Sequence, residues 1–200
     1  MTTLNLLSLI VFCAFLASYV LKLIILYSKN NIQANVLGKG GKKLTAIKST
    51  EWFVKIATFL WGAAWFLMSV AEPYLVNLLG RHYNLPVVNY IGAGIVSIGC
   101  AVFILAMATM NTSWRVGIDK STTTRLVTRG VYKYSRNAAF VGFDLMFAGL
   151  YLMYPNWLTL VILVLNIVAI HLLILQEEEH LRLVFGDEYR SYSRKTPRYL

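Results

Sequence analysis

Residues 138–176, AAFVGFDLMFAGLYLMYPNWLTLVILVLNIVAIHLLILQ, form two apolar runs that are separated by Pro155 and Asn156. A helix needs about 20 apolar residues to cross a hydrocarbon core of ~30 Å. Two residues leave room for a tight turn and nothing longer, so the two runs have to lie antiparallel. The stretch therefore predicts a helical hairpin in a membrane, with one helix over 138–154 and the other over 157–176.

The composition of the whole chain agrees with a membrane location. Of its 200 residues, 58% are hydrophobic and 14% are charged, whereas soluble chains average roughly 45–50% and about 25%. A soluble globule, a disordered chain and a disulfide scaffold are therefore excluded. Three further apolar runs lie at 4–27, 52–70 and 86–110. We expect an all-α polytopic membrane protein with about five transmembrane helices, the last two forming the hairpin.

Positive charge is unevenly distributed along the chain. The formal net charge is +10, and most of the 19 Lys and Arg residues fall within 28–51, 111–137 and 177–200. Five membrane crossings place these three segments on one side, and Lys and Arg accumulate on the cytoplasmic side. We therefore expect the N-terminus outside and the C-terminus in the cytoplasm. The same placement argues against nucleic acid as a partner and favours attraction to anionic membrane lipids.

The expected helices divide the chain into two parts, residues 1–110 with three helices and residues 111–200 with the hairpin and a C-terminal tail. Asp144 and Asn166 are equally far from Pro155 in sequence, so they should lie at similar depth. Polar groups are costly inside a membrane. We expect these two side chains to bond each other or a polar group on another helix.

Small residues form a ridge in the third run. Ala93, Ser97 and Ala101 follow at four-residue spacing, with Gly92 and Gly99 nearby. Such a ridge lets helices approach closely. We expect it to pack against another helix of this chain or of a second copy, so the oligomeric state stays open.

Polar side chains gather where the hairpin leaves the membrane, because 132–137 and 171–178 lie at comparable distances from the turn. They are Arg125, Arg129, Tyr132, Tyr134, Arg136, Asn137, His171, Glu177, Glu178 and Glu179. Cations, carboxylates and aromatic rings suit a small zwitterionic cofactor that meets a lipid-borne substrate. They equally suit an interfacial belt with a solvated acidic run. Neither cysteine has a partner at metal-ligand spacing, so no metal site is expected.

Several motifs follow one another in this region. They are Ser113–Asp119 (SWRVGID), Leu126–Tyr132 (LVTRGVY), Arg136–Gly142 (RNAAFVG), Glu177–Leu181 (EEEHL) and Phe185–Tyr192 (FGDEYRSY). In this order and spacing they resemble the membrane isoprenylcysteine carboxyl methyltransferases and their bacterial relatives, which are related to the phospholipid methyltransferases. The resemblance covers about residues 111–200.

The resemblance implies an S-adenosylmethionine-dependent methyltransferase with a cytosol-facing pocket that opens sideways to lipid. It also implies a lipid or a prenylated protein or small molecule as methyl acceptor, with O-methyl transfer to a carboxylate favoured and N-methyl transfer as the alternative. Matched by position, the cofactor-binding residues are Gly117, Thr124, Arg125, Leu126, Val127, Tyr132, Asn137, Ala138, Ala139, Phe140 and Glu177.

The chemistry of the cofactor suggests a role for several of these residues. Arg136 or Arg125 can pair with its carboxylate, and Glu177 can accept its ammonium. Tyr132 and Phe140 can stack on adenine or face the sulfonium. We expect Arg136 and Glu178 to be the catalytic pair. A carboxylate acceptor needs no general base, whereas an amine or hydroxyl needs one, for which Glu178, His171 or Tyr132 are candidates.

The chain departs from the family pattern at four positions. Asn137, Ala138 and Phe140 stand where the family has His, Pro and Tyr, and Leu173 stands where it has Arg. The replacements at Ala138, Phe140 and Leu173 leave a non-catalytic membrane scaffold open as an alternative. A second alternative is an NADPH-dependent membrane lipid or sterol reductase of related membrane architecture.

Overall fold

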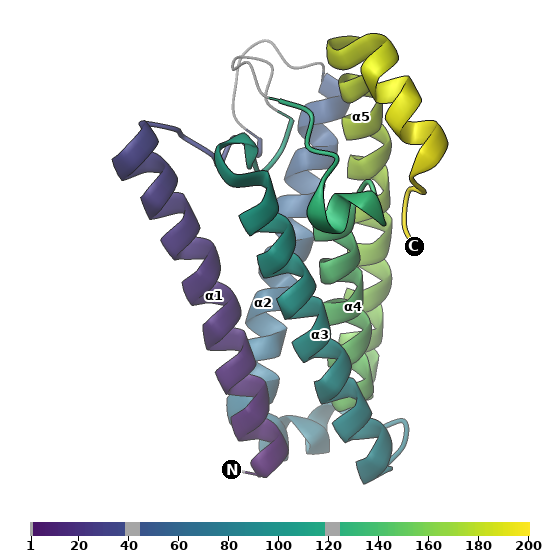
Figure 1. The fold of residues 1–200 in the computed structure, drawn as a ribbon. Helices are drawn as coiled ribbons and strands as arrows, with labels where there is room; N and C mark the ends of the chain where they lie inside the picture. Colours follow the sequence, from purple (N-terminus) through teal and green to yellow (C-terminus); the bar gives the residue numbers. More distant parts are fainter. Residues whose placement is uncertain (1, 39–44, 119–124) are drawn as a thin grey trace.

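The computed structural model describes residues 2–38, 45–118 and 125–200, and these form five α-helices in one bundle (Figure 1). The helices are α1 (Thr3–Asn30), α2 (Thr45–Leu79), α3 (Pro86–Met110), α4 (Ala138–Met153) and α5 (Trp157–Lys195). Two short 3-10 helices, η1 (Asn111–Ser113) and η2 (Gly130–Lys133), lie between α3 and α4. No strand is present in the described ranges, so the predicted all-α class is confirmed.

Four of the described helices, α1, α2, α3 and α5, are long and apolar enough to cross a membrane. The fifth, α4, is apolar but has only 16 residues, fewer than the roughly 20 that a full crossing needs. The hairpin of α4 and α5 is confirmed. Its turn is stabilised by Asn156, whose side chain accepts a hydrogen bond from the Thr159 amide in a capping box, which starts α5.

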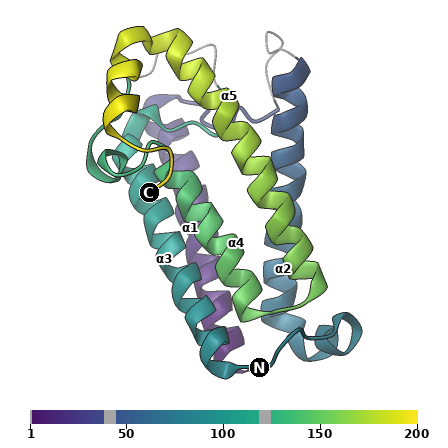
Figure 2. The ribbon, with the colours of Figure 1, turned by 90° about the vertical axis from the view of Figure 1, so that its right-hand side faces the viewer.

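Two helices run further than the apolar runs suggest. α2 continues to Leu79 through a non-helical residue, Ala71, just before Pro73, where proline disrupts the helix. The expected end of α5 at Gln176 is wrong, because the helix continues to Lys195. It bends at Gly186, whose φ of 51° favours glycine. The bend folds the last turns back over the end of the bundle (Figure 2).

The close contact between α3 and α4 uses glycines rather than the ridge we expected. An added Cβ on Gly99 would lie 2.7 Å from the Gly142 carbonyl oxygen, and one on Gly149 would lie 2.7 Å from the Val96 nitrogen. Ala93 is buried, but Ala101 is exposed. Glycine brings the backbones closer than alanine permits, which explains why the glycine face packs inward.

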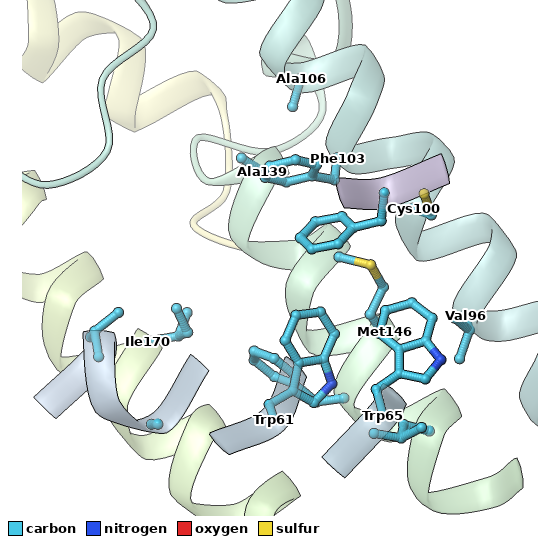
Figure 3. Close-up of a cluster of buried hydrophobic side chains, with 14 of the residues drawn as sticks. Trp61, Trp65, Val96, Cys100, Phe103, Ala106, Ala139, Met146 and Ile170 are labelled. Carbon is cyan, nitrogen blue, oxygen red and sulfur yellow. The ribbon is translucent and has the colours of Figure 1, made fainter. Parts of the chain in front are cut away.

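Aromatic side chains fill the middle of the bundle, where Trp61 and Trp65 of α2 lie among residues of α3 and α4 (Figure 3). The ring centroids of Trp61 and Phe147 are 5.0 Å apart, and those of Phe103 and Phe143 are 4.9 Å apart. These edge-to-face contacts are favourable. Trp61, Phe103 and Phe143 of this cluster also line the cavity described below.

The two polar residues of the hairpin do not bond each other within the described structure. Asn166 donates instead to the carbonyl of Ala57 on α2 at 3.1 Å, so its expected bond to another helix is confirmed. Oδ1 of Asp144 is buried without a hydrogen-bond partner. The bond to Ala57 shows that Asn166 faces α2, and such a rotation of the helix cannot be predicted from equal depth alone.

Candidate active site

The bundle has two ends of different character. We call the end with residues 31–38, 111–118, 125–137 and 177–200 the loop end, and the end with Pro155 the turn end. At the turn end α1 and α2 are joined by hydrogen bonds, Ser8 to Ser69 at 2.7 Å and Trp65 to Ser8 at 2.9 Å. The two helices lean apart toward the loop end (Figures 1 and 2).

A cavity of about 950 Å³ occupies the space between the diverging helices and the loop end. Its α1 and α2 side is mostly apolar and includes side chains that are exposed at the surface of the bundle, such as Leu16, Phe59 and Phe66. Its loop-end side carries charged, amide and aromatic side chains. The cavity therefore joins a polar chamber to an apolar groove between α1 and α2.

The structure brings most of the sequence-predicted site residues to this cavity. Those that line it are Gly117, Arg125, Leu126, Val127, Tyr132, Arg136, Asn137, Ala139, Phe140 and Glu177. Ala138 and Glu178 are not among the described lining residues, and Thr124 lies outside the described residues. The two motifs that flank the hairpin thus meet, because the antiparallel helices return the chain to the same end.

Glu177 lies just past the apolar part of α5 and lines the cavity. Burial raises the pKa of its carboxyl to about 7, and the nearby carboxylates of Glu178 and Glu51 add to the shift. An acid with this pKa changes charge near neutral pH. A cationic ligand group in the cavity would favour its ionised form.

Tyr132 of η2 also lines the cavity and is 5% exposed. Burial raises the pKa of its hydroxyl above the ordinary value, and the carboxylate of Glu177 raises it further. The backbone at this residue is held by Tyr192, whose hydroxyl donates to the Tyr132 carbonyl at 2.6 Å. Tyr132 therefore keeps its proton at neutral pH and offers the cavity an aromatic face rather than a base.

Glu178 is not among the described residues that line the cavity, and its carboxylate is the centre of a cluster of hydrogen bonds. Its Oε1 accepts from Nη2 of Arg136 at 2.9 Å and from Nδ2 of Asn137 at 3.1 Å, and its Oε2 accepts from Nη2 of Arg198 at 2.9 Å. Burial alone would raise the pKa of Glu178, but the hydrogen bonds from both arginines outweigh it and lower the pKa. The carboxylate therefore stays ionised as the centre of this cluster.

Arg136 touches the cavity but is largely engaged elsewhere. Besides the two bonds to Glu178, its Nη1 donates to the carbonyls of Ser193 at 2.9 Å and Thr196 at 2.7 Å. Four of the five N–H donors of a guanidinium are thus used within the protein. Its described contacts tie the start of α4 to the C-terminal tail.

The cavity also has two cations that were given no role from the sequence. Arg115, which belongs to the Ser113–Asp119 motif, and Lys55 of α2, which belongs to none of the motifs, line it together with Arg125. Lys55 lies 4.5 Å from the ring centre of Trp52. No signal in the sequence marks Lys55 as a site residue, because only the convergence of α2 with the loop after η1 brings it to the same space as Arg115.

His171, a candidate base, is absent from the described lining residues, and its ring bonds the hydroxyl of Tyr199 at 2.5 Å. Leu173, the position where the family pattern has arginine, does line the cavity and is 3% exposed. The structure thus gives that wall of the cavity an apolar side chain in place of a cation.

A comparison with protein families finds a match over the second half of the chain. Residues 87–188, about half of the chain, match the family described as phospholipid methyltransferase. The matched stretch runs from the first turn of α3 through α4 and beyond the bend of α5. The sequence motifs resemble the isoprenylcysteine carboxyl methyltransferases, but the matching family is the related phospholipid methyltransferase family. A comparison with curated proteins finds no match.

Proposed function

Because the chain belongs to the phospholipid methyltransferase family, we propose that it is an integral membrane enzyme that methylates the head group of a membrane lipid with S-adenosylmethionine. The observation that carries this proposal is the form of the cavity. One continuous space joins a polar chamber at the loop end to an apolar groove between α1 and α2. This form suits a water-soluble cofactor that meets a lipid-borne acceptor.

The residues of the chamber fit the parts of the cofactor. Its ammonium matches the carboxylate of Glu177, and its carboxylate matches Arg125 or Arg115. The adenine and the sulfonium match the rings of Tyr132 and Phe140. When bound, the cofactor supplies an activated methyl group, and the protein mainly has to align the reactants and exclude water. The engagement of Arg136 by Glu178 favours Arg125 over Arg136 for the cofactor carboxylate.

Glu178 and Arg136 have a different role in this proposal from the catalytic role that the motifs suggest. Their described hydrogen bonds fasten Arg136 and Asn137 to the end of α5 and to the C-terminal tail. Asn137, which lines the cavity, donates to Glu178 and to the Arg198 carbonyl from the same amide nitrogen. The pair therefore shapes the chamber wall rather than touching the reacting atoms.

The apolar groove fits the chain of the acceptor. Gly62 lines it, and a Cβ at this position would meet nothing within 4 Å. Exposed Phe59 and Phe66 border it on α2 and Leu16 borders it on α1. Lipid tails can therefore enter sideways between the two helices, which keeps the head group at the membrane surface near the cofactor.

Among acceptors, we favour an amine of a phospholipid over a carboxylate of a prenylated cysteine. The family match points to phospholipids, and Leu173 supplies no cation for a carboxylate. An amine is mostly protonated at neutral pH and must lose a proton before methyl transfer. Glu177 and His180 line the cavity, and their carboxylate and imidazole are the candidate acceptors of this proton among the described residues. The match also favours methyl transfer over the reductase chemistry considered from the sequence.

The proposal is tested with purified protein in detergent or lipid nanodiscs. S-adenosylhomocysteine should bind, NADPH should not compete with it, and labelled methyl groups should pass from the cofactor to phospholipids of a total lipid extract. Mass spectrometry of the product then identifies the acceptor. A protein that neither binds S-adenosylhomocysteine nor labels any lipid would be a scaffold, and the proposal would be wrong.

We further propose that the loop end faces the cytoplasm, where Lys and Arg accumulate and where anionic lipids attract basic segments. A reporter enzyme that is active only in the cytoplasm, fused after Leu200, should be active. The last side chain is 85% exposed, so the fusion should not disturb the fold. An inactive C-terminal fusion together with an active N-terminal one would reverse this orientation.

A further inference from the structure

The first connecting segment, between α1 and α2, pairs with the segment that follows η1. The amide of Val36 donates to the carbonyl of Val116 at 3.0 Å, and the amide of Val116 donates to the carbonyl of Ala34 at 2.8 Å. Asn35 and Leu37 on one side and Val116 to Ile118 on the other line the cavity. The wall of the chamber is thus built from two segments that lie far apart in sequence.

Glu51, in the second turn of α2, ties these segments together. Its Oε2 accepts from the Gly38 amide at 2.8 Å, and its Oε1 accepts from the Ile118 amide at 2.8 Å. The residue is 0% exposed. A buried carboxylate is stable only when hydrogen bonds or charges compensate it, so both amides have to be held in place for Glu51 to stay buried.

The approach of the two segments leaves no spare room at Gly117. Its φ of 90° suits glycine, and a Cβ there would lie 2.8 Å from Cα of Leu37 and 2.9 Å from Oε1 of Glu51. Gly117 is one of the residues predicted to contact the cofactor. Its position in the wall is therefore set by Glu51, which lies outside the matched residues 87–188.

Glu51 also acts on the cavity through its charge. Its carboxylate is near enough to Glu177 to contribute, after burial and Glu178, to the raised pKa of Glu177. Among the described residues, the other charged or titratable groups that line the cavity are Tyr19 of α1, Lys55 of α2, Tyr132 of η2, Arg136 before α4, Arg115 and Arg125 of the loop, and His180, Tyr189 and Tyr192 of α5.

We propose that Glu51 is a positioning residue of the cofactor chamber. Its carboxylate bonds residues 34–38 and residues 114–118 together, and so keeps Gly117 in place beside the bound cofactor. This inference rests on the proposed function, because the chamber is taken to hold S-adenosylmethionine. It brings the N-terminal part of the chain, which carries none of the motifs, into the site.

The test compares Glu51→Gln with the wild type in S-adenosylhomocysteine binding and in amide hydrogen exchange. The glutamine keeps the size but presents an NH₂ group to one of the two backbone amides. A buried amide left without an acceptor costs enough to lower the affinity about tenfold or more. Exchange of residues 34–38 and 114–118 should become faster, and the pH midpoint of binding, set by Glu177, should move to lower pH because one neighbouring negative charge is lost.

The matched control is Glu179→Gln, which removes a carboxylate whose side chain is 62% exposed and should change none of the three readouts. An unchanged affinity, an unchanged midpoint or unchanged exchange of the two segments in Glu51→Gln overturns the assignment. If Glu51→Gln does not fold, amide hydrogen exchange of the wild type is the test. S-adenosylhomocysteine should slow the exchange of residues 34–38 and 114–118, and exchange that the ligand does not change overturns the assignment. Absence of binding by the wild type would overturn the proposed function, and the cofactor role of Glu51 with it.

Discussion

Replacing Glu178 by glutamine should destabilise the protein without removing a reacting group. The Glu178 side chain is 3% exposed and accepts hydrogen bonds from Arg136, Arg198 and Asn137. Removing one partner of a buried ion pair costs about 3–5 kcal/mol. The Arg198 side chain is 33% exposed, so water screens its share, and the glutamine oxygen can still accept one bond. We therefore expect a loss near the lower end, about 3 kcal/mol.

Thermal unfolding of the ligand-free protein measures this loss. In a chain of this size 1 kcal/mol corresponds to about 2–4 °C in Tm, so the midpoint should fall by about 6–12 °C. A double-mutant cycle of Glu178→Gln with Arg198→Gln should give a coupling energy of about 1–2 kcal/mol. At temperatures where Glu178→Gln is still folded, it should retain methyl transfer.

Two comparisons make this prediction decisive. Glu179→Gln, next along the helix and exposed, should stay within about 0.5 kcal/mol of the wild type. Because the arginines lower the pKa of Glu178, its stabilisation should persist at neutral pH and be lost as the pH falls below the ordinary glutamate value of about 4.3. A variant with the Tm of the wild type but without methyl transfer would refute the reasoning and return Glu178 to a catalytic role.

Three further outcomes are expected. Since the pKa of Glu177 is about 7, S-adenosylhomocysteine affinity measured by calorimetry should rise between about pH 6 and pH 8 as the carboxylate ionises, and Glu177→Gln should bind more weakly with a flat profile; a wild-type profile in that variant would exclude the ammonium contact. Gly62→Trp should fill the groove and abolish lipid methylation while cofactor binding persists, whereas Gly94→Trp, at an equally open but exposed position outside the cavity, should leave both intact; equal activities would place acceptor entry elsewhere. Gly149→Ala puts a methyl group 2.7 Å from the Val96 nitrogen and should cost about 1–3 kcal/mol in unfolding experiments, and a stability like that of the wild type would mean that α3 and α4 separate easily.

The pair Glu177 and Glu178 shows where prediction from sequence stopped. Both belong to the motif after the hairpin, and the motif indicates that acidic groups belong to the site. Neighbours on a helix point about 100° apart, and the motif does not tell which of the two carboxylates lines the cavity. The rotation of α5 depends on its packing against α2 and α4 and on the return of the C-terminal tail, none of which is visible in the motif.

The same limit explains the glycines and Glu51. The small residues of α3 indicated a close contact, but two faces of the helix carry them, and only the matching glycines of α4 decide which face is used. Glu51 is one carboxylate near the start of α2, and its hydrogen-bond partners at Gly38 and Ile118 are 13 and 67 residues away. Contacts between residues so far apart in sequence produce no periodic pattern from which they could be predicted.

Local chemistry was therefore enough for the helices, the Pro155–Asn156 turn and the meeting of the two motif segments, because apolar length and a short connection restrict a membrane chain to few arrangements. The tertiary structure alone decided which carboxylate faces the cavity, which arginines are already engaged, and how the N-terminal helices complete the site. These are matters of helix rotation and of long-range hydrogen bonds, and both are determined by the packing of the whole bundle rather than by any one segment.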